Sequence, residues 1–349
     1  MLLLQELAAL PGVAGSESPV AELIADCIRQ RGGDVRTDST GNVMGLFEGS
    51  HRCRRRVMIS AHMDQVGLMI TNVIEGGFLK FTAIGSIDPR ILPGVEVNVH
   101  GTRTASGIIG TRPPHLVPEE ERRKPIPMED LFIDTGMGEQ ESKAIFRPGC
   151  VASFRMPPKP LVEGSFSSPG LDNRVGVAVA LMAAGLAGQY GHADDIVVVA
   201  TAQEELGMRG ATVAAYSLKP NLGLAVDVTF ASMGSEPEPK TVPMGKGPAI
   251  GIGPHLNPKL ASQLKECAQR HSIQHQMEPL PSATGTDASA LQISRSGIPT
   301  GLVSIPIRYM HSPVETVRWK DIEDSAELVG RFLSSLDEDF WRELDHAAV

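Results

Sequence analysis

The stretch IVVVATAQEELG, residues 196–207, places two adjacent glutamates directly after an apolar run. The run of Ile, Val and Ala lies between Asp194 and Asp195 on one side and polar residues on the other, which is typical of a buried parallel strand. Glu204 and Glu205 therefore follow the carboxyl end of this strand. Open α/β sheets bind their ligands at that edge. The stretch predicts an α/β fold with a ligand site beside the two glutamates.

Three other apolar runs end in the same way, each followed by residues of types that bind metals. These residues are His62 and Asp64 after residues 57–61, Asp227 after residues 222–226, and His311 after residues 301–307. Asp172 opens a further stretch, residues 173–187, that has the pattern of a helix. A single Asp or His at a strand end is usually a cap or a solvated loop residue. Five such coincidences in one chain indicate a shared site.

The residue types in this set suit a pair of divalent metal ions. Imidazole and carboxylate are donors that Zn²⁺, Co²⁺ and Mn²⁺ accept, and one aspartate can bridge two ions. Two ions about 3.5 to 4 Å apart polarise a carbonyl group and lower the pKa of the water between them. A protein nucleophile is then unnecessary, and the sequence contains no G-x-S-x-G elbow around a serine.

Asp64, Glu204 and Glu205 have expected roles beside the metals. Alternation along an extended chain puts His62 and Asp64 on one face, so Asp64 can accept a hydrogen bond from the imidazole nitrogen that does not bind metal. Adjacent glutamates on a loop can point in different directions. One can bind metal while its neighbour faces the substrate and transfers a proton as a general acid and base.

Length and composition limit the class of protein. A chain of 349 residues is long enough for two structural units, and 42% hydrophobic with 21% charged residues is ordinary for a globular protein. The absence of any run of about 18 apolar residues argues against a membrane role. A formal net charge of -9 argues against nonspecific nucleic-acid binding. The isolated cysteines, without a CxxC pair, predict reduced thiols and a cytoplasmic location.

The pattern of apolar residues and of Gly and Pro changes after Asp64. Residues 66–166 show short alternating or β-branched runs broken by Gly and Pro, which is typical of a small all-β barrel. Helical and apolar stretches alternate again in residues 167–349, including an amphipathic helix expected over residues 326–336. We therefore expect a discontinuous α/β domain made of residues 1–65 and 167–349, interrupted by an inserted barrel domain. The Pro- and charge-rich residues 113–127 are expected to form an exposed loop at the edge of the barrel.

Six segments, taken in order, resemble one family: the co-catalytic metal aminopeptidases of the TET type, which include glutamyl and deblocking aminopeptidases and some proteins once labelled cellulases. The matching segments are AHMDQVG (61–67), LDNRVG (171–176), QEELGMRGA (203–211), AVDVT (225–229), GTDA (285–288) and RYMHSP (308–313). The resemblance implies a three-layer α/β/α metallopeptidase domain with a mixed, mostly parallel sheet. It also implies that the inserted barrel is a dimerisation domain, and that dimers build a hollow tetrahedral dodecamer that admits peptides.

The resemblance also implies a role for each candidate residue. Asp172 would bridge two divalent ions, with His62 and Asp227 completing one site and Glu205 and His311 the other. Glu204 would be the general base and Asp64 would orient His62. No further cofactor is expected. The substrate pocket is expected to draw on four residues: Gly285, Thr286, Asp287 and His255.

Two positions depart from the family pattern, and other functions stay open. Gln65 stands where the family commonly has Glu, and Pro169 lies in an altered segment before Leu171. A glycoside hydrolase could use Glu204 with Asp172 or Asp227 as paired carboxylates, although only 4% of residues are aromatic. A related carboxypeptidase or amide deacylase would need almost the same metals. A noncatalytic assembly protein would be expected to have lost a ligand or the base.

Overall fold

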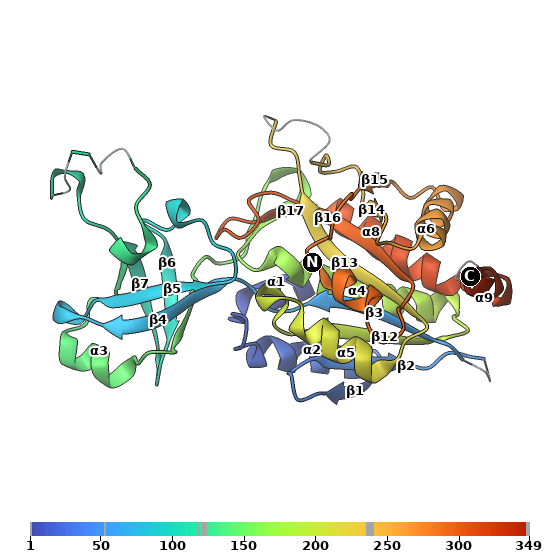
Figure 1. Cartoon of the computed structure of the whole chain (residues 1–349), viewed down its shortest axis with the longest axis horizontal. Helices are drawn as coiled ribbons and strands as arrows, with labels where there is room; N and C mark the ends of the chain where they lie inside the picture. Colours follow the sequence, from blue (N-terminus) through green and yellow to red (C-terminus); the bar gives the residue numbers. More distant parts are fainter. Residues whose placement is uncertain (1, 52–53, 117–118, 121–123, 235–240, 347–349) are drawn as a thin grey trace.

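An eight-stranded mixed sheet forms the centre of the larger part of the molecule in the computed structural model (Figure 1). The structure describes residues 2–51, 54–116, 119–120, 124–234 and 241–346. The sheet contains, in spatial order, β1 (Asp34–Thr37), β2 (Val43–Phe47), β12 (Asp195–Thr201), β3 (Arg56–His62), β13 (Leu222–Phe230), β16 (Thr300–Ile307), β14 (Ala249–Ile252) and β15 (Gln276–Pro279).

The four central strands are parallel, and this alignment creates the functional edge. β12 pairs in parallel with β3, β3 with β13, and β13 with β16. In this register Thr201 lies beside His62, and Asp227 lies beside Ser304. The carboxyl ends of the four strands therefore meet at one edge of the sheet.

Helices cover both faces of the sheet. They are α1 (Leu2–Ala9), α2 (Ser18–Gln30), α4 (Leu171–Tyr190), α5 (Arg209–Leu218), α6 (Pro258–Arg270), α7 (Asp287–Gln292), α8 (Trp319–Ser334) and α9 (Glu338–His346). One face packs against α1, α2, α4, α6 and α8 in a single apolar core, and the other packs against α5 and α7. The predicted three-layer α/β/α fold class is confirmed.

One described helix, α4, is long and apolar enough to cross a membrane by length and composition. In the fold it lies between the sheet and α8, and its most apolar window is 78% buried inside the protein. A helix that is apolar on all sides is expected in such a position, because each of its faces contacts other elements.

A closed barrel of six strands forms the smaller part of the molecule, to the left in Figure 1. Its strands, in order around the barrel, are β4 (Gly67–Val73), β5 (Leu79–Ile84), β8 (Phe132–Asp134), β7 (Thr104–Gly110), β6 (Glu96–His100) and β9 (Val151–Phe154). Alternate residues point inward to a separate apolar core, and a short helix, α3 (Glu139–Ile145), packs beside it. The predicted inserted barrel is therefore present.

The chain returns from the barrel through a small three-stranded sheet. Its strands are β10 (Lys159–Pro160), β11 (Ser165–Ser167) and β17 (Thr316–Arg318). The domain boundaries at residues 65 and 166 stay a prediction. Of the predicted loop over residues 113–127, positions 117–118 and 121–123 lie outside the described residues.

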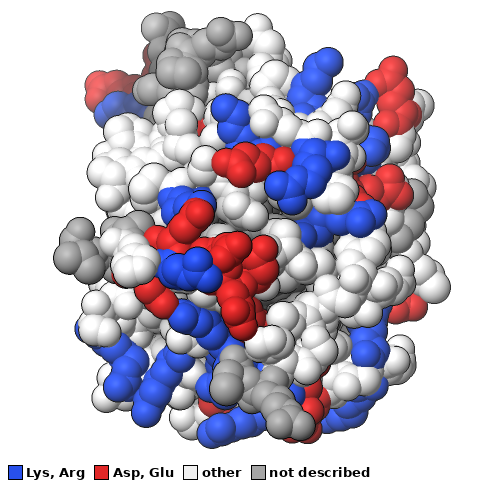
Figure 2. All heavy atoms as spheres, turned by 90° about the vertical axis from the view of Figure 1, so that its right-hand side faces the viewer, with Lys and Arg blue, Asp and Glu red and all other residues white. Residues whose placement is uncertain are grey.

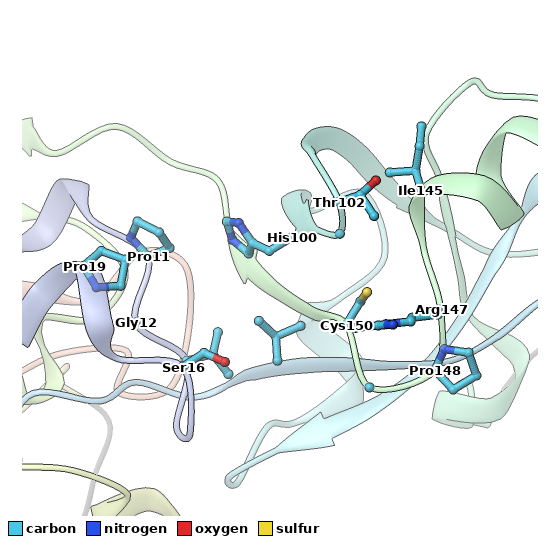
Figure 3. Close-up of a pocket in the computed structure, with 14 residues that line it drawn as sticks. Pro11, Gly12, Ser16, Pro19, His100, Thr102, Ile145, Arg147, Pro148 and Cys150 are labelled. Carbon is cyan, nitrogen blue, oxygen red and sulfur yellow. The ribbon is translucent and has the colours of Figure 1, made fainter. Parts of the chain in front are cut away.

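A hollow of about 730 Å³ lies between the barrel and the connection from α1 to α2 (Figure 3). Pro11 and Pro19 lie on one side of it, and Arg147 and Cys150 lie on the barrel side. Its described lining residues do not include the predicted metal ligands, so this hollow lies apart from the predicted chemistry.

The helix predicted over residues 326–336 begins earlier in the structure than expected. α8 begins at Trp319, seven residues earlier, and ends at Ser334. Its first turns contain acidic residues that concealed the apolar pattern. One of them, Asp321, is fully buried. Its carboxylate accepts hydrogen bonds from the backbone amides of Gly245 and Gly247, which offset the cost of burying it. This contact joins segments that are far apart in the sequence.

Charged side chains of both signs are interspersed on the face of the molecule shown in Figure 2. On helix α9, Asp345 forms an ion pair with Arg55 at 2.6 Å, and Glu343 forms one with Lys259 of α6. Such exposed pairs each contribute little to stability. This face therefore carries mixed charge rather than the single-sign field that steers a polyanion.

Candidate metal centre

Two histidines face the two oxygen atoms of one aspartate at the carboxyl edge of the sheet. The Nε2 atom of His62, at the end of β3, lies 3.1 Å from Oδ1 of Asp172. The Nε2 atom of His311, which follows β16, lies 3.2 Å from Oδ2 of the same carboxylate. Asp172 lies in the first turn of α4 and is buried. This is the arrangement that a bridging carboxylate requires.

Three further carboxylates surround this core. Oδ1 of Asp227 lies 3.7 Å from Nε2 of His62, and Oε2 of Glu204 lies 3.9 Å from the same atom. On the other side, Oε1 of Glu205 lies 3.3 Å from Nε2 of His311. The structure therefore brings the five predicted ligands and the predicted base into one cluster.

The Asp64 carboxylate lies beside His62, as expected, and also contacts a second group. The nearest acceptor to Nδ1 of His62 is the carbonyl oxygen of Asp64, at 3.1 Å, while the carboxylate oxygen Oδ1 lies at 3.5 Å. The two carboxylate oxygens also accept hydrogen bonds from the backbone amides of Glu204 at 3.0 Å and Glu205 at 3.1 Å. Asp64 therefore holds the loop that carries both glutamates.

Glu315 holds the other half of the site and is not among the residues predicted from the sequence. It is buried, and its two oxygens accept hydrogen bonds from the backbone amides of Asp172 at 3.0 Å and His311 at 2.8 Å. Its position four residues after His311 was the available signal. A carboxylate so close to a predicted ligand can turn back onto that ligand's own backbone.

The loops that present the ligands adopt uncommon backbone conformations. Gln203, Tyr309 and His311 have positive φ angles of 57°, 58° and 60°. Residues other than glycine seldom adopt this region, and such positions cluster at functional sites. Asp64 and Glu315 supply hydrogen bonds that hold these two loops.

Gly176 allows α4 to approach the strand that carries Asp227. The Nδ2 atom of Asn173 donates a hydrogen bond to the carbonyl oxygen of Val226 at 2.8 Å. A Cβ atom at Gly176 would lie 2.6 Å from that carbonyl oxygen and 2.2 Å from Oδ1 of Asn173. A side chain at this position would therefore separate Asp172 from Asp227.

Burial of so many charges in one place changes their protonation. Burial raises the pKa of Glu204 to about 9. Burial and the charge of Asp172 raise the pKa of Glu315 to about 8. Burial lowers the pKa of His311, but hydrogen bonds with Asp172 and Glu205 outweigh it and raise the value to about 11. The buried carboxylates of the cluster therefore favour a cation, or a proton, between them.

The residues of the cluster fit divalent metal ions. One ligand atom each from His62, Asp172 and Glu205 lies within 4.8 Å of the other two. Oε1 of Glu205 is buried and faces Nε2 of His311 at 3.3 Å, so a cation between these two atoms would contact both. Two imidazoles with carboxylates are also the donor set that Zn²⁺, Co²⁺ and Mn²⁺ accept.

A fully buried arginine lies behind the metal centre. Nη1 of Arg174 donates hydrogen bonds to the carbonyl oxygens of Leu7 at 2.7 Å and Leu10 at 2.5 Å. Its charge acts on Glu315 and Asp64, the two carboxylates that hold the ligand loops. Arg174 therefore connects the N-terminal helix to the support of the site.

We expect Arg174→Met to lower the free energy of unfolding by about 3 to 5 kcal/mol, because it removes two buried hydrogen bonds from a charged group to the carbonyl oxygens of Leu7 and Leu10. Thermal and urea unfolding of the metal-loaded protein would measure the loss. The control is Arg270→Met, at the exposed end of α6, which should stay within about 0.5 kcal/mol of the parent. Equal stability of the two variants would contradict the assigned role of Arg174.

The four predicted pocket residues have different surroundings. Asp287 is buried, accepts a hydrogen bond from Oγ1 of Thr201 at 2.7 Å, and its charge acts on Glu204 and Asp227. Thr286 caps α7, which Gly285 precedes. Among the described contacts of His255, none joins it to the metal cluster. Its Nε2 atom is buried without a hydrogen-bond partner. Their predicted role in substrate binding stays a prediction.

The two departures from the family pattern lie side by side. Gln65 is buried, and a Cβ atom on Gly170 would lie 2.2 Å from its Oε1 atom. Gln65 and Pro169 both line a hollow of about 390 Å³ beside the barrel. These departures therefore change a surface behind Asp172 rather than the ligand set itself.

A three-layer α/β/α fold with an inserted barrel, and a cluster of histidines and carboxylates at its sheet edge, define a metallopeptidase-type hydrolase. The chain belongs to the M42 glutamyl aminopeptidase family, whose model matches residues 41–328. The resemblance drawn from the sequence motifs is therefore confirmed.

Individual relatives agree with this assignment. The chain is 36% identical over 340 residues to a lysyl aminopeptidase of Pyrococcus furiosus, with 96% of each chain covered. It is similar in structure to the aminopeptidase APDkam598 of Desulfurococcus kamchatkensis, with a TM-score of 0.91, 33% identity, and 98% and 96% of the two chains covered. It is also similar to the TET1 peptidase of Pyrococcus horikoshii, with a TM-score of 0.84, 31% identity, and 96% and 99% covered.

Proposed function

We propose that the chain is a dinuclear metal-dependent aminopeptidase that hydrolyses the first peptide bond of peptides. The observation that carries the proposal is the single carboxylate of Asp172 between His62 and His311, with Glu204 beside it. Two ions, Zn²⁺ or alternatively Co²⁺ or Mn²⁺, would polarise the peptide carbonyl and lower the pKa of the attacking water when bound. His62 and Asp227 would hold one ion, and Glu205 and His311 the other.

Glu204 has the position of the general base. Its side chain is 10% exposed, and the Asp64 carboxylate fixes its backbone. A carboxylate in this position takes a proton from water and later hands it to the leaving amine. Burial raises the pKa of Glu204, so this carboxylate can hold the proton between the two steps.

We infer that the chain forms a homo-oligomer through its barrel. The related TET1 peptidase of Pyrococcus horikoshii is described as assembling into a tetrahedron or a large octahedral shell. A tetrahedral dodecamer built from dimers is the corresponding proposal for this chain. The cytoplasmic location is proposed from cysteine usage, and Cys27, Cys150 and Cys267 are free thiols in the structure.

The proposed function predicts that amino-acid p-nitroanilides with a free α-amine are cleaved and that their N-acetylated counterparts are not. A chelator should abolish the cleavage, and Zn²⁺, Co²⁺ or Mn²⁺ should restore it. The reason is that the proposed mechanism needs bound metal to lower the pKa of the attacking water. Release of nitroaniline measures both effects. Release of nitroaniline from the acetylated substrates at a similar rate would contradict the requirement for a free α-amine, and cleavage unaffected by the chelator would exclude the metal mechanism.

A further inference from the structure

Gly85, directly after β5 of the barrel, lies beside the carboxylate of Glu205 in the larger part of the molecule. A Cβ atom on Gly85 would lie 3.2 Å from Oε2 of Glu205 and 2.8 Å from Cγ1 of Val66. Non-bonded carbon atoms are normally about 3.5 to 4.0 Å apart. The space between Val66 and Glu205 therefore has no room for a side chain, and the barrel contacts a predicted metal ligand through a residue that has none.

The register of β4 and β5 brings Gly85 to this place. The two strands are antiparallel neighbours in the barrel, and Gly67 at the start of β4 pairs with Ile84 at the end of β5 (Figure 1). Val66 and Gly85 come next along the two strands and lie side by side. Val66 follows Asp64 by two residues, and the Asp64 carboxylate holds the loop of the two glutamates. The first strand pair of the barrel is therefore a direct continuation of the metal-binding segment.

The side chain of Glu205 is confined between the barrel and His311. It is 6% exposed, and its backbone amide is bound by the Asp64 carboxylate. Oε1 lies 3.3 Å from Nε2 of His311, and Oε2 lies on the side of Gly85. The two oxygens belong to one planar group. A shift of Oε2 away from residue 85 therefore also moves Oε1 relative to His311.

The turn at Gly85 makes a second, separate demand for glycine. Its φ angle is 76°, in the left-handed region that glycine adopts without steric cost. Gly94, in the same barrel, has a φ angle of 87°. A Cβ atom on Gly94 would have no atom of the described residues within 4 Å, its chain neighbours aside. Comparison of the two glycines therefore separates backbone strain from the contact with Glu205.

We propose that Gly85 is a positioning residue for the metal ligand Glu205, so that the barrel forms one side of the site assigned to Glu205 and His311. This inference rests on the proposed dinuclear metal centre. Because residue 85 has no side chain, the Glu205 carboxylate stays directed at His311. The barrel thus supports metal binding within its own chain, a role separate from the proposed one in oligomerisation.

Zn²⁺ binding to Gly85→Ala and Gly94→Ala tests the proposal. Each metal-free protein is titrated with Zn²⁺ in competition with a coloured chelator, without substrate. We expect Gly85→Ala to bind one ion about 10- to 100-fold more weakly than the parent and the other ion within about threefold of it, as for loss of a residue that supports a metal ligand. Gly94→Ala is the matched control, because it introduces the same methyl group at a similar φ angle in open space. It should bind both ions as the parent does.

Equal affinities of Gly85→Ala and Gly94→Ala for both ions would overturn the role of Gly85, and so would equal weakening of both ions in Gly85→Ala. If Gly85→Ala does not fold, amide hydrogen exchange of the parent decides instead. Zn²⁺ should slow exchange in residues 84–86 and leave it unchanged in residues 94–95, and the same change in both segments would overturn the inference. A parent protein that binds fewer than two ions would count against the proposed dinuclear centre itself, so the two failures are distinguishable.

Discussion

Glu204→Gln is expected to lower kcat by about 10²- to 10⁴-fold while both metal ions stay bound, which is the usual effect of removing a general base. Glutamine has the shape of glutamate but does not take up a proton at neutral pH. The backbone of residue 204 stays fixed by the Asp64 carboxylate, which accepts its amide proton in either variant. The loss should therefore be in chemistry rather than in assembly of the site.

Metal analysis and steady-state kinetics on the same preparations would test this expectation. The matched control is Glu205→Gln, which changes the adjacent carboxylate in the same way. Glu205 faces His311 rather than His62, so we expect its variant to lose affinity for one ion and to recover activity at high metal concentration. Activity of Glu204→Gln should not recover under those conditions. A fully active Glu204→Gln enzyme would show that another group is the base.

The sequence was sufficient to place most residues of the candidate metal centre because parallel strands share one carboxyl edge. His62, Asp227 and His311 each follow an apolar run, and β3, β13 and β16 are neighbours in the sheet. Side chains that end neighbouring parallel strands must lie close together, whatever separates them in the chain. Glu204 and Glu205 lie at this edge for the same reason, because they follow β12, which pairs with β3.

The residues that hold the ligands were harder to predict because their contacts depend on tertiary structure. Glu315 binds a backbone amide 143 positions away, and Asp64 binds amides 140 and 141 positions away. Alternation along a strand predicts which side chains share a face, but the chain leaves the sheet after His62. Arg174 and Asp321 likewise looked like ordinary charged residues, since nothing in their local sequence indicates that distant backbone atoms bury them.

Asp172→Asn is expected to remove both metal ions, and with them the activity, whereas Asp227→Asn should remove one. The reason is the geometry of the Asp172 carboxylate, whose two oxygens lie 3.1 Å and 3.2 Å from Nε2 of the two histidines. Asparagine keeps one oxygen and replaces the other with a group that does not bind a cation. Loss of a residue that only hydrogen-bonds to a metal ligand usually lowers metal affinity by about 10- to 100-fold. We therefore expect the affinity for both ions to fall by at least about 100-fold when the shared ligand itself is changed.

Metal content after dialysis against a weak chelator separates the two variants. Asp227 lies 3.7 Å from His62, and the described contacts do not join it to His311, so Asp227→Asn should keep the ion held by Glu205 and His311. Asp172→Asn should retain neither, although its fold persists, because Glu315 binds the backbone amide of residue 172 and not its side chain. A folded Asp172→Asn protein that keeps one ion at the parent's affinity would contradict a bridging role. The two histidines would then belong to sites that are independent of each other.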